Sequence, residues 1–316
     1  MQRKQLVVAA AACCLMSGFA YAQEQITSEL DASLRLGLGL NTEPDAELTF
    51  ENYASRIRWS GSADAGKGLK AISYLEFGFD QDAGVSNTRH AWLGVEGDFG
   101  TLKGGKQYSA FYDAVTSAVD IAYWGSCYHE LSCSRSSSVI KFTGPEDADI
   151  QYMASTILVP NDTDNDFIDG IDIGARTTSG DLSIGAGATL LIGNSIGGMD
   201  LGTGVGLGLS VSKPVDEATV SLSLQFANED YIGGDDSGFV IAGTYSKDQY
   251  YGIVSLADSD NTPFYITLGY EKPVINDRAF TYFELSAVEP DIDGQDIDLQ
   301  ARAVMVFNMD LLSMGR

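Results

Sequence analysis

Basic residues, histidine, proline and long apolar runs are all scarce in this chain. Its 316 residues include 19 Lys and Arg against 44 Asp and Glu, for a formal net charge of −25. A surface this acidic repels a phosphate backbone, which argues against nucleic acid as a partner. After the first 22 residues no stretch of about 18 consecutive apolar residues occurs, so we predict no transmembrane helix. A closed β-barrel remains possible, because it also satisfies its backbone within a bilayer.

The N-terminal segment has the pattern of a secretion signal. A short basic region at Gln2 to Lys4 precedes a mostly apolar stretch from Leu6 to Ala20, and Ala20-Tyr21-Ala22 is a small-residue cleavage site. The apolar stretch is shorter than the ~20 residues that span a bilayer, which argues against a membrane anchor. We therefore predict a cleaved signal peptide over residues 1–22 and an exported chain over residues 23–316.

Cysteine is scarce too, with four residues in the whole chain. Cys13 and Cys14 fall within the signal peptide, which leaves Cys127 and Cys133 in the segment C-Y-H-E-L-S-C. An exported chain meets an oxidising compartment, so a disulfide between these two is expected. Closing so short a loop would contribute about 2 kcal/mol. A metal site that also uses His129 is the alternative.

The sequence is rich in a two-residue hydrophobic period. In A-T-V-S-L-S-L-Q-F-A (218–227), Val220, Leu222, Leu224 and Phe226 share one face, while Thr, Ser and Gln occupy the other. In L-G-T-G-V-G-L-G-L-S-V-S (201–212), glycine takes most of the polar positions. Such alternation is typical of half-apolar β-strands. We predict sixteen of them, near residues 28–40, 48–62, 67–80, 87–97, 100–107, 136–143, 148–158, 168–177, 181–192, 199–212, 217–227, 237–247, 250–258, 262–272, 278–289 and 296–309.

The connections and the strand faces together indicate the architecture. Short turns at 97–100, 178–181, 213–217 and 246–249 alternate with longer acidic links. One strand face is small, polar or charged, as a water-filled lumen requires. Aromatic residues gather at strand ends, where a membrane barrel carries interfacial girdles: Tyr53, Trp59, Phe79, Trp92, Phe142, Tyr152, Tyr250, Tyr251, Phe280, Tyr282 and Phe307. We predict an all-β fold, a transmembrane antiparallel β-barrel of about 16 strands; a secreted sandwich or several small β domains is the soluble alternative.

Four segments carry a more specific pattern. They are A-S-R-I-R-W-S-G (54–61), Y-L-E-F-G-F-D (74–80), T-R-H-A-W-L-G-V-E-G-D-F-G-T-L-K-G-G-K-Q-Y-S-A-F-Y-D-A (88–114) and S-R-S-S-S-V-I-K-F (134–142). In these motifs the chain resembles the Gram-negative general-diffusion porins, and in layout the resemblance covers the whole mature chain. It implies an outer-membrane homotrimer in contact with lipid and lipopolysaccharide, whose channels pass small hydrophilic solutes and ions. A substrate-selective channel is the alternative.

The resemblance also implies where the channel narrows. A long loop over residues 108–135, the longest stretch without alternation, is expected to fold into the lumen. Opposed basic and acidic side chains across such a gap set up a transverse field. The basic wall would comprise Arg35, Arg56, Arg89 and Arg135, joined by Arg58 and Arg302, which share the lumen parity of their strands. Glu76, in L-E-F-G-F, is expected to pair with one of these arginines. A position at the rim near lipid headgroups is the alternative for each arginine.

The acidic side departs from the family pattern. Asp113 and Asp120 lie in F-Y-D-A-V-T-S-A-V-D, which matches the start of the family's inward loop. The familiar P-E-F-G-G-D tip is replaced by Y-W-G-S-C-Y-H-E-L-S-C, so Glu130 is the candidate tip carboxylate. Ordinary solvated loop charge is the alternative for all three. The family usually ends in Phe, whereas here Phe307 is followed by N-M-D-L-L-S-M-G-R.

The sequence gives little support for an enzymatic site or a metal site. The chain has no P-loop, no H-E-x-x-H and no dinucleotide fingerprint. His90 and His129 do not lie in a recognisable Ser-His-Asp arrangement, and His90 is expected to face away from the lumen, opposite to Arg89. We predict no catalysis and no cofactor, with an outer-membrane hydrolase as the alternative. Asp162, Asp164 and Asp166 have D-x-D-x-D spacing that could bind Ca²⁺, although a solvated external loop is the simpler interpretation.

Overall fold

The chain is described by a computed structural model for residues 26–42, 46–80, 84–124, 126–127, 130–158, 168–196, 199–232, 237–258, 263–276, 278–289 and 297–315. Within these ranges no helix is long and apolar enough to cross a membrane. The predicted signal peptide, His129 and the Asp162, Asp164 and Asp166 group lie outside the described residues.

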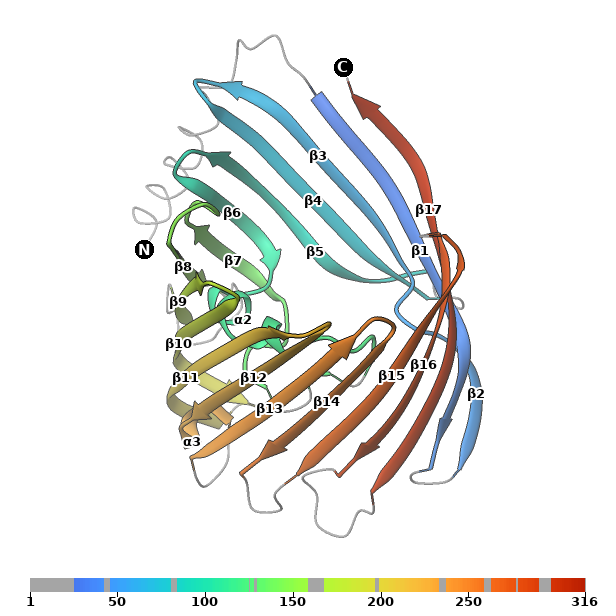
Figure 1. The fold of residues 1–316 in the computed structure, drawn as a ribbon. Coiled ribbons are helices and arrows are strands. Elements are labelled where there is room, and N and C mark those ends of the chain that lie inside the picture. Colours follow the sequence, from blue (N-terminus) through green and yellow to red (C-terminus); the bar gives the residue numbers. More distant parts are fainter. Residues whose placement is uncertain are drawn as a thin grey trace.

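The described residues form one antiparallel sheet that curls into a barrel (Figure 1). Its strands are β1 Ile26–Asn41, β2 Glu47–Asn52, β3 Arg56–Gly66, β4 Leu69–Asp80, β5 Gly84–Gly97, β6 Gly100–Gln107, β7 Ser136–Thr143, β8 Ile150–Ile157, β9 Gly170–Ser179, β10 Leu182–Ile196, β11 Met199–Val215, β12 Ala218–Ala227, β13 Gly238–Lys247, β14 Tyr250–Ala257, β15 Phe264–Ile275, β16 Ala279–Val288 and β17 Asp298–Gly315. β17 pairs with β1 from Thr27↔Gly315 to Leu40↔Ala301, which closes the ring. The prediction of an all-β barrel is confirmed, and the soluble sandwich is excluded.

The second barrel strand, predicted as continuous over 48–62, is broken in two. β2 pairs with the C-terminal part of β1, and β3 pairs with its N-terminal part, so the two share one of sixteen positions in the ring. Between them Ala54 adopts φ 58°, a left-handed conformation that costs a non-glycine residue about 1–2 kcal/mol. At this break Ser55 replaces a backbone hydrogen bond between the strands, because its Oγ accepts a 2.7 Å hydrogen bond from the Arg35 amide.

The alternation in the sequence separates a lipid face from an inner face. On β12, Leu222 and Leu224 are each 47% exposed on the outer surface, whereas Ser223 and Gln225 are buried inside the barrel. Apolar side chains can remain on the outside only if hydrocarbon covers them, since such a band in water would be a large exposed apolar patch. The predicted two faces are therefore present along the strand.

The aromatic girdle is smaller than predicted. Tyr152 and Tyr250 are each 61% exposed on the outer face, as expected. Trp92, by contrast, shares the inward face of β5 with Glu96, which pairs with Lys70. Tyr53, Tyr251, Phe280 and Tyr282 also turn inward, where they meet the aromatic residues of the long loop. An aromatic residue near the end of a strand can face lipid or pack against the loop inside the barrel, and its position along the strand does not distinguish the two.

The C-terminal residues continue the last strand. β17 extends to Gly315, and residues 312–315 pair with residues 27–30 of β1 beyond a register shift between Leu30 and Asp31. Phe307 therefore lies within the strand, opposite Leu34, and faces outward with 41% exposure.

Candidate pore constriction

The long loop between β6 and β7 passes through the interior of the barrel (Figure 1). It begins with the short helix α2 (Ala110–Ala114), whose N-cap Ser109 accepts a 3.2 Å hydrogen bond from the Tyr112 amide. The Ala110 amide donates to Ser155 Oγ on β8 at 2.9 Å, and that hydroxyl donates to Asp172 on β9, also at 2.9 Å. A buried chain of hydrogen bonds thus fixes the start of the loop to the wall.

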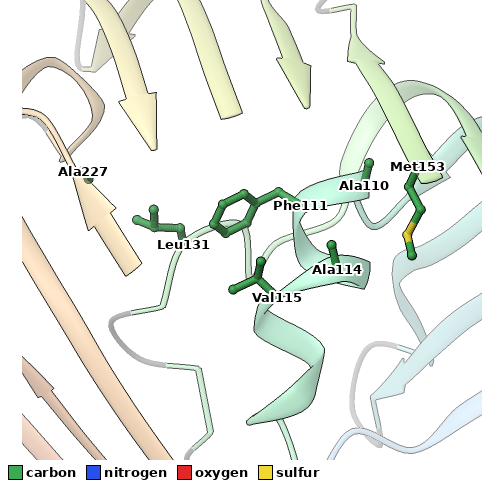
Figure 2. Close-up of a cluster of buried hydrophobic side chains, with 7 residues drawn as sticks. All are labelled: Ala110, Phe111, Ala114, Val115, Leu131, Met153 and Ala227. Atoms are coloured by element: carbon green, nitrogen blue, oxygen red, sulfur yellow. The ribbon is translucent and has the colours of Figure 1, made fainter. Parts of the chain in front are cut away.

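A glycine-lined hollow in the wall receives this part of the loop. The hollow consists of inward-facing glycines on three consecutive strands: Gly174 on β9, Gly185 and Gly187 on β10, and Gly206 and Gly208 on β11. Phe111 and Val115 fill it and are fully buried (Figure 2). A Cβ at Gly208 would lie 2.7 Å from Phe111 Cζ, and one at Gly187 would lie 3.0 Å from Phe111 Cδ2. The absence of a side chain at these five positions is what lets the helix approach so closely.

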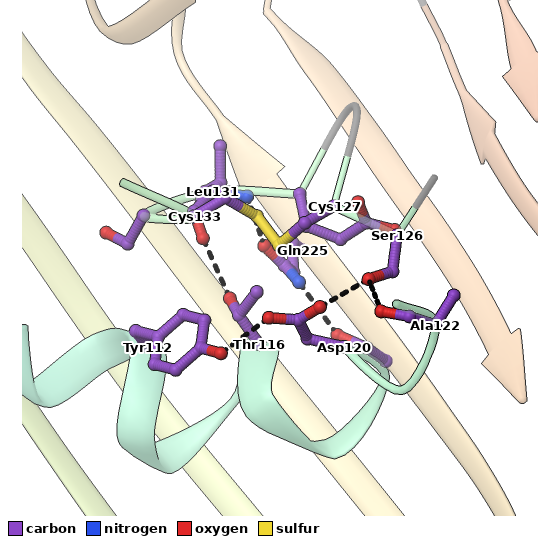
Figure 3. The surroundings of a disulfide bond; sticks show 12 residues. Tyr112, Thr116, Asp120, Ala122, Ser126, Cys127, Leu131, Cys133 and Gln225 are labelled. Atoms are coloured by element: carbon purple, nitrogen blue, oxygen red, sulfur yellow. Dashed lines mark hydrogen bonds between the residues drawn. A yellow bond between two sulfur atoms is a disulfide. The ribbon is translucent and has the colours of Figure 1, made fainter. Parts of the chain in front are cut away.

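The C-terminal part of the loop is braced by the disulfide between Cys127 and Cys133, which confirms that prediction. Figure 3 shows the bridge beside Gln225, whose Oε1 accepts a 2.7 Å hydrogen bond from the Leu131 amide. The Cys127 amide donates to the hydroxyl of Tyr265 on β15 at 2.9 Å. The bridged turn is therefore attached to the wall at two points. Because the two Sγ atoms are bonded to each other, they do not provide the thiolates that the alternative metal site would need.

Glu284 on β16 anchors the middle of the loop, at Tyr123 and Trp124. Its carboxylate accepts hydrogen bonds from the amides of Tyr123 at 2.9 Å and Trp124 at 3.1 Å, and from the hydroxyl of Tyr251 at 2.7 Å. Glu284 is 1% exposed. Sequence reasoning missed this residue, as it missed Ser155, Asp172, Gln225 and Tyr265. Lumen parity was the available signal, but parity alone does not say which inward residue meets the loop.

Arg56, Arg89 and Glu76 meet in one cluster on the wall formed by β3, β4 and β5. The carboxylate of Glu76 accepts from Arg89 Nε at 2.5 Å and lies 3.6 Å from Arg56 Nη1. Arg58, two residues along the same strand as Arg56, pairs with Asp31 on β1 at 2.5 Å. Glu76 is 5% exposed, so this shared carboxylate holds two arginines close together away from bulk water.

A β-bulge overturns the expected orientation of His90. β4 pairs with β5 as Glu76↔His90 and then Phe77↔Thr88, which leaves Arg89 as an extra residue. A bulge interrupts the strict alternation of faces, and both neighbours point inward. The Nε2 atom of His90 accepts a 2.8 Å hydrogen bond from Arg135 Nε, so the histidine supports the arginine wall and does not contribute to an outer girdle.

Aromatic residues of the loop face the remaining arginines. The guanidinium of Arg35 lies 5.6 Å from the ring centre of Tyr123, and that of Arg302 lies 4.8 Å from the ring of Trp124. Arg135 lies 4.2 Å over the ring of Tyr108. Each is a cation–π contact, which attracts a cation without neutralising its charge.

The predicted loop carboxylates contact a lysine and three hydroxyl groups. Asp113 forms an ion pair with Lys141 on β7. Asp120 accepts hydrogen bonds from the hydroxyls of Tyr112 and Ser126 inside the loop. Burial raises the pKa of the Tyr112 phenol, and the Asp120 carboxylate raises it further, which keeps Tyr112 a hydrogen-bond donor. Glu130, buried at 6% exposure, accepts a 2.9 Å hydrogen bond from Tyr265.

Comparison with known proteins gives one family. The family model described as Gram-negative porin matches residues 9–288. The major outer membrane protein P.IA of Neisseria meningitidis serogroup A is 36% identical over 78 residues, which cover 22% of this chain and 18% of that protein. The matched segment therefore spans about a fifth of the length of these curated relatives.

Solved structures resemble the chain over nearly its whole length. An anion-selective porin from Comamonas acidovorans superposes with a TM-score of 0.74 at 17% identity, covering 90% of this chain and 100% of the other. The trimer form of OmpT, an outer membrane protein of Vibrio cholerae, superposes with a TM-score of 0.66 at 17% identity, covering 90% and 99%. At these identities the likeness concerns the fold.

Proposed function

Because this chain belongs to the Gram-negative porin family, we propose that it forms a water-filled outer-membrane channel for the passive diffusion of small hydrophilic solutes and ions. The observation that carries the proposal is the loop fixed inside a closed barrel, opposite a wall of arginines. An inner face of Ser, Gly and charged side chains lets water fill the space that the loop leaves open. Passage through such an opening needs neither a cofactor nor a catalytic residue.

Arg35, Arg56, Arg58, Arg89, Arg135 and Arg302 form the basic side of the constriction in this proposal. Glu76 and Asp31 are the carboxylates that pair with Arg56, Arg58 and Arg89. The carboxylates of Asp113, Asp120 and Glu130, which we expected across the gap, contact Lys141, Tyr112, Ser126 and Tyr265. The six arginines outnumber Glu76 and Asp31, the two carboxylates that pair with them, and we propose that the channel favours anions along this wall despite the net charge of −25.

The expected assembly is a homotrimer embedded in outer-membrane lipid and lipopolysaccharide. A structural relative solved in a trimer form supports this state. The apolar outer face, with residues such as Leu222 and Leu224 exposed, supplies the surface that lipid or a neighbouring subunit would cover.

Single-channel recording in a planar bilayer tests the proposal. Wild-type protein should show stepwise conductance, with steps grouped in threes, and a reversal potential in a KCl gradient that indicates anion preference. Arg89→Ser should move that potential toward cation selectivity, because it removes a positive charge beside Glu76. Arg278→Ser is the control, since Arg278 lies in the turn between β15 and β16, is exposed, and pairs with the exposed Asp310.

One outcome would contradict the channel function, and another would contradict the placement of Arg89. A protein that inserts but never conducts would not be a channel. If the wild-type protein conducts but the Arg89→Ser variant keeps the same reversal potential, Arg89 does not line the constriction.

A further inference from the structure

A polar cavity of about 470 Å³ lies between the inward loop and the wall formed by β8 to β12. The loop contributes Ser117, Ala118 and Ile121 to it. The wall contributes residues near the short turns, which face the periplasm in an outer-membrane barrel. The cavity is separate from the arginine cluster, which lies on β3 and β5.

A row of hydroxyl groups crosses the wall of this cavity. Thr178 on β9 is opposite Ser183 on β10, Ser183 is opposite Ser212 on β11, and Ser212 is opposite Ser221 on β12. Adjacent strands lie about 4.8 Å apart, so the four residues that carry these hydroxyls follow one another across the wall at close to that interval. The Ser221 hydroxyl donates to Ser212 at 2.9 Å, and those of Thr178 and Ser183 are 3.4 Å apart.

Further polar groups border the row. The Nη2 atom of Arg176 donates to Ser117 Oγ at 2.6 Å, and its Nε donates to the Ala114 carbonyl at 3.4 Å. These bonds hold the guanidinium against the loop. Glu146 also lines the cavity, so the two charged lining residues balance one another. Gln151 adds an amide to the lining.

We propose that this cavity binds a neutral polyhydroxylated solute, of the mono- or disaccharide class, during its passage through the channel. Hydroxyl groups both donate and accept hydrogen bonds, as sugar hydroxyls do. The side chains of Ile121 and Ala118 offer an apolar surface to the C–H face of a sugar ring. A small anion is not expected here, because the arginine wall holds the larger positive charge and Glu146 repels it.

The binding is weak, which suits a channel. Each neutral hydrogen bond contributes about 0.5–1.5 kcal/mol net because it replaces a bond to water. A solute held by a few such bonds is retained long enough to be selected and still leaves. The inference rests on the proposed channel function and adds a substrate class to it.

The test is single-channel recording with sucrose on the side of the short turns. Wild-type channels should show interruptions of the open current whose frequency rises with sucrose concentration. In the triple variant Ser183→Ala/Ser212→Ala/Ser221→Ala, the half-blocking concentration should rise about tenfold or more. The control Thr267→Ala/Ser286→Ala removes a hydroxyl pair 2.9 Å apart on β15 and β16, outside the cavity, and should behave as wild type.

The outcomes separate this inference from the channel function. An unchanged sucrose-free conductance of the triple variant shows that its barrel is intact; if that variant does not insert, Ser212→Ala alone should raise the half-blocking concentration about threefold. A wild-type channel that conducts in steps but shows no sucrose interruptions overturns the sugar site and leaves the channel function standing. Equal blocking of the triple variant and wild type also overturns it, and an absence of any conductance overturns both.

Discussion

Gly208 on β11 faces the ring of Phe111 so closely that a Cβ at that glycine would lie 2.7 Å from Phe111 Cζ. The missing side chain on the wall and the buried ring on the loop form one fitted contact between parts of the chain nearly 100 residues apart. Gly187 on the neighbouring strand repeats the relationship at 3.0 Å. The position of the constriction loop thus depends on residues of β10 and β11, whereas the cluster of Arg56 and Arg89 lies on β3 and β5.

Gly208→Ala should push α2 away from the wall. Overpacking of a filled site costs about 1–3 kcal/mol, and the loop can relieve it by moving into the lumen. We expect a lower single-channel conductance and frequent partial closures. Gly243→Ala is the matched control, because a Cβ at Gly243 would meet its nearest neighbour at 3.9 Å. Identical conductance traces for the two variants would contradict the fitted contact.

Glu284→Ala should release the middle of the loop, at Tyr123 and Trp124, from the wall. The substitution leaves the amides of Tyr123 and Trp124 and the hydroxyl of Tyr251 without their shared acceptor. Hydrogen bonds to a charged group contribute about 1.5–3 kcal/mol each. We expect a noisier open current and a larger mean conductance, measured in planar bilayers at constant voltage. Glu217→Ala, which breaks an exposed ion pair with Lys247, is the control and should leave the current quiet.

Removal of the disulfide should loosen the loop more than it weakens the barrel. Cys127→Ser/Cys133→Ser eliminates the bridge, but the backbone bonds to Gln225 and Tyr265 remain. Closure of so short a loop contributes about 2 kcal/mol at most, whereas the barrel is held by the hydrogen bonds of every strand. We expect extra current fluctuations with little change in urea-induced unfolding. A large drop in the unfolding midpoint would show that the bridge supports the whole barrel.

Ala54→Gly should stabilise the break in the second barrel strand. Ala54 has φ 58°, and glycine adopts that region without the steric cost borne by alanine. Part of the gain is lost because glycine is more flexible in the unfolded chain. We expect a gain of up to about 1 kcal/mol in the free energy of unfolding measured in urea. Ala54→Val should move the midpoint in the opposite direction, and equal midpoints for both variants would contradict a left-handed backbone at this position.

The sequence by itself determined the barrel, the inward loop segment and the cysteine pair. In residues 218–227 the alternation of Leu222 and Leu224 with Ser221 and Ser223 separates two environments, because successive side chains of a strand must point to opposite faces. That rule is local, so it can be followed from one residue to the next. The run of alternate glycines in β10 and β11 was also visible, but nothing local says that another part of the chain will fill it.

Only the tertiary structure decided what each inward residue meets. The bulge at Arg89 turns His90 inward, and its cause lies in the pairing of two strands rather than in either one. Glu130 and Asp120 look like constriction carboxylates in the sequence, yet Tyr265, Tyr112 and Ser126 bind them. Which residue a charged group contacts depends on how the barrel closes and how the loop passes through it. Those are contacts between distant parts of the chain, which a two-residue period does not encode.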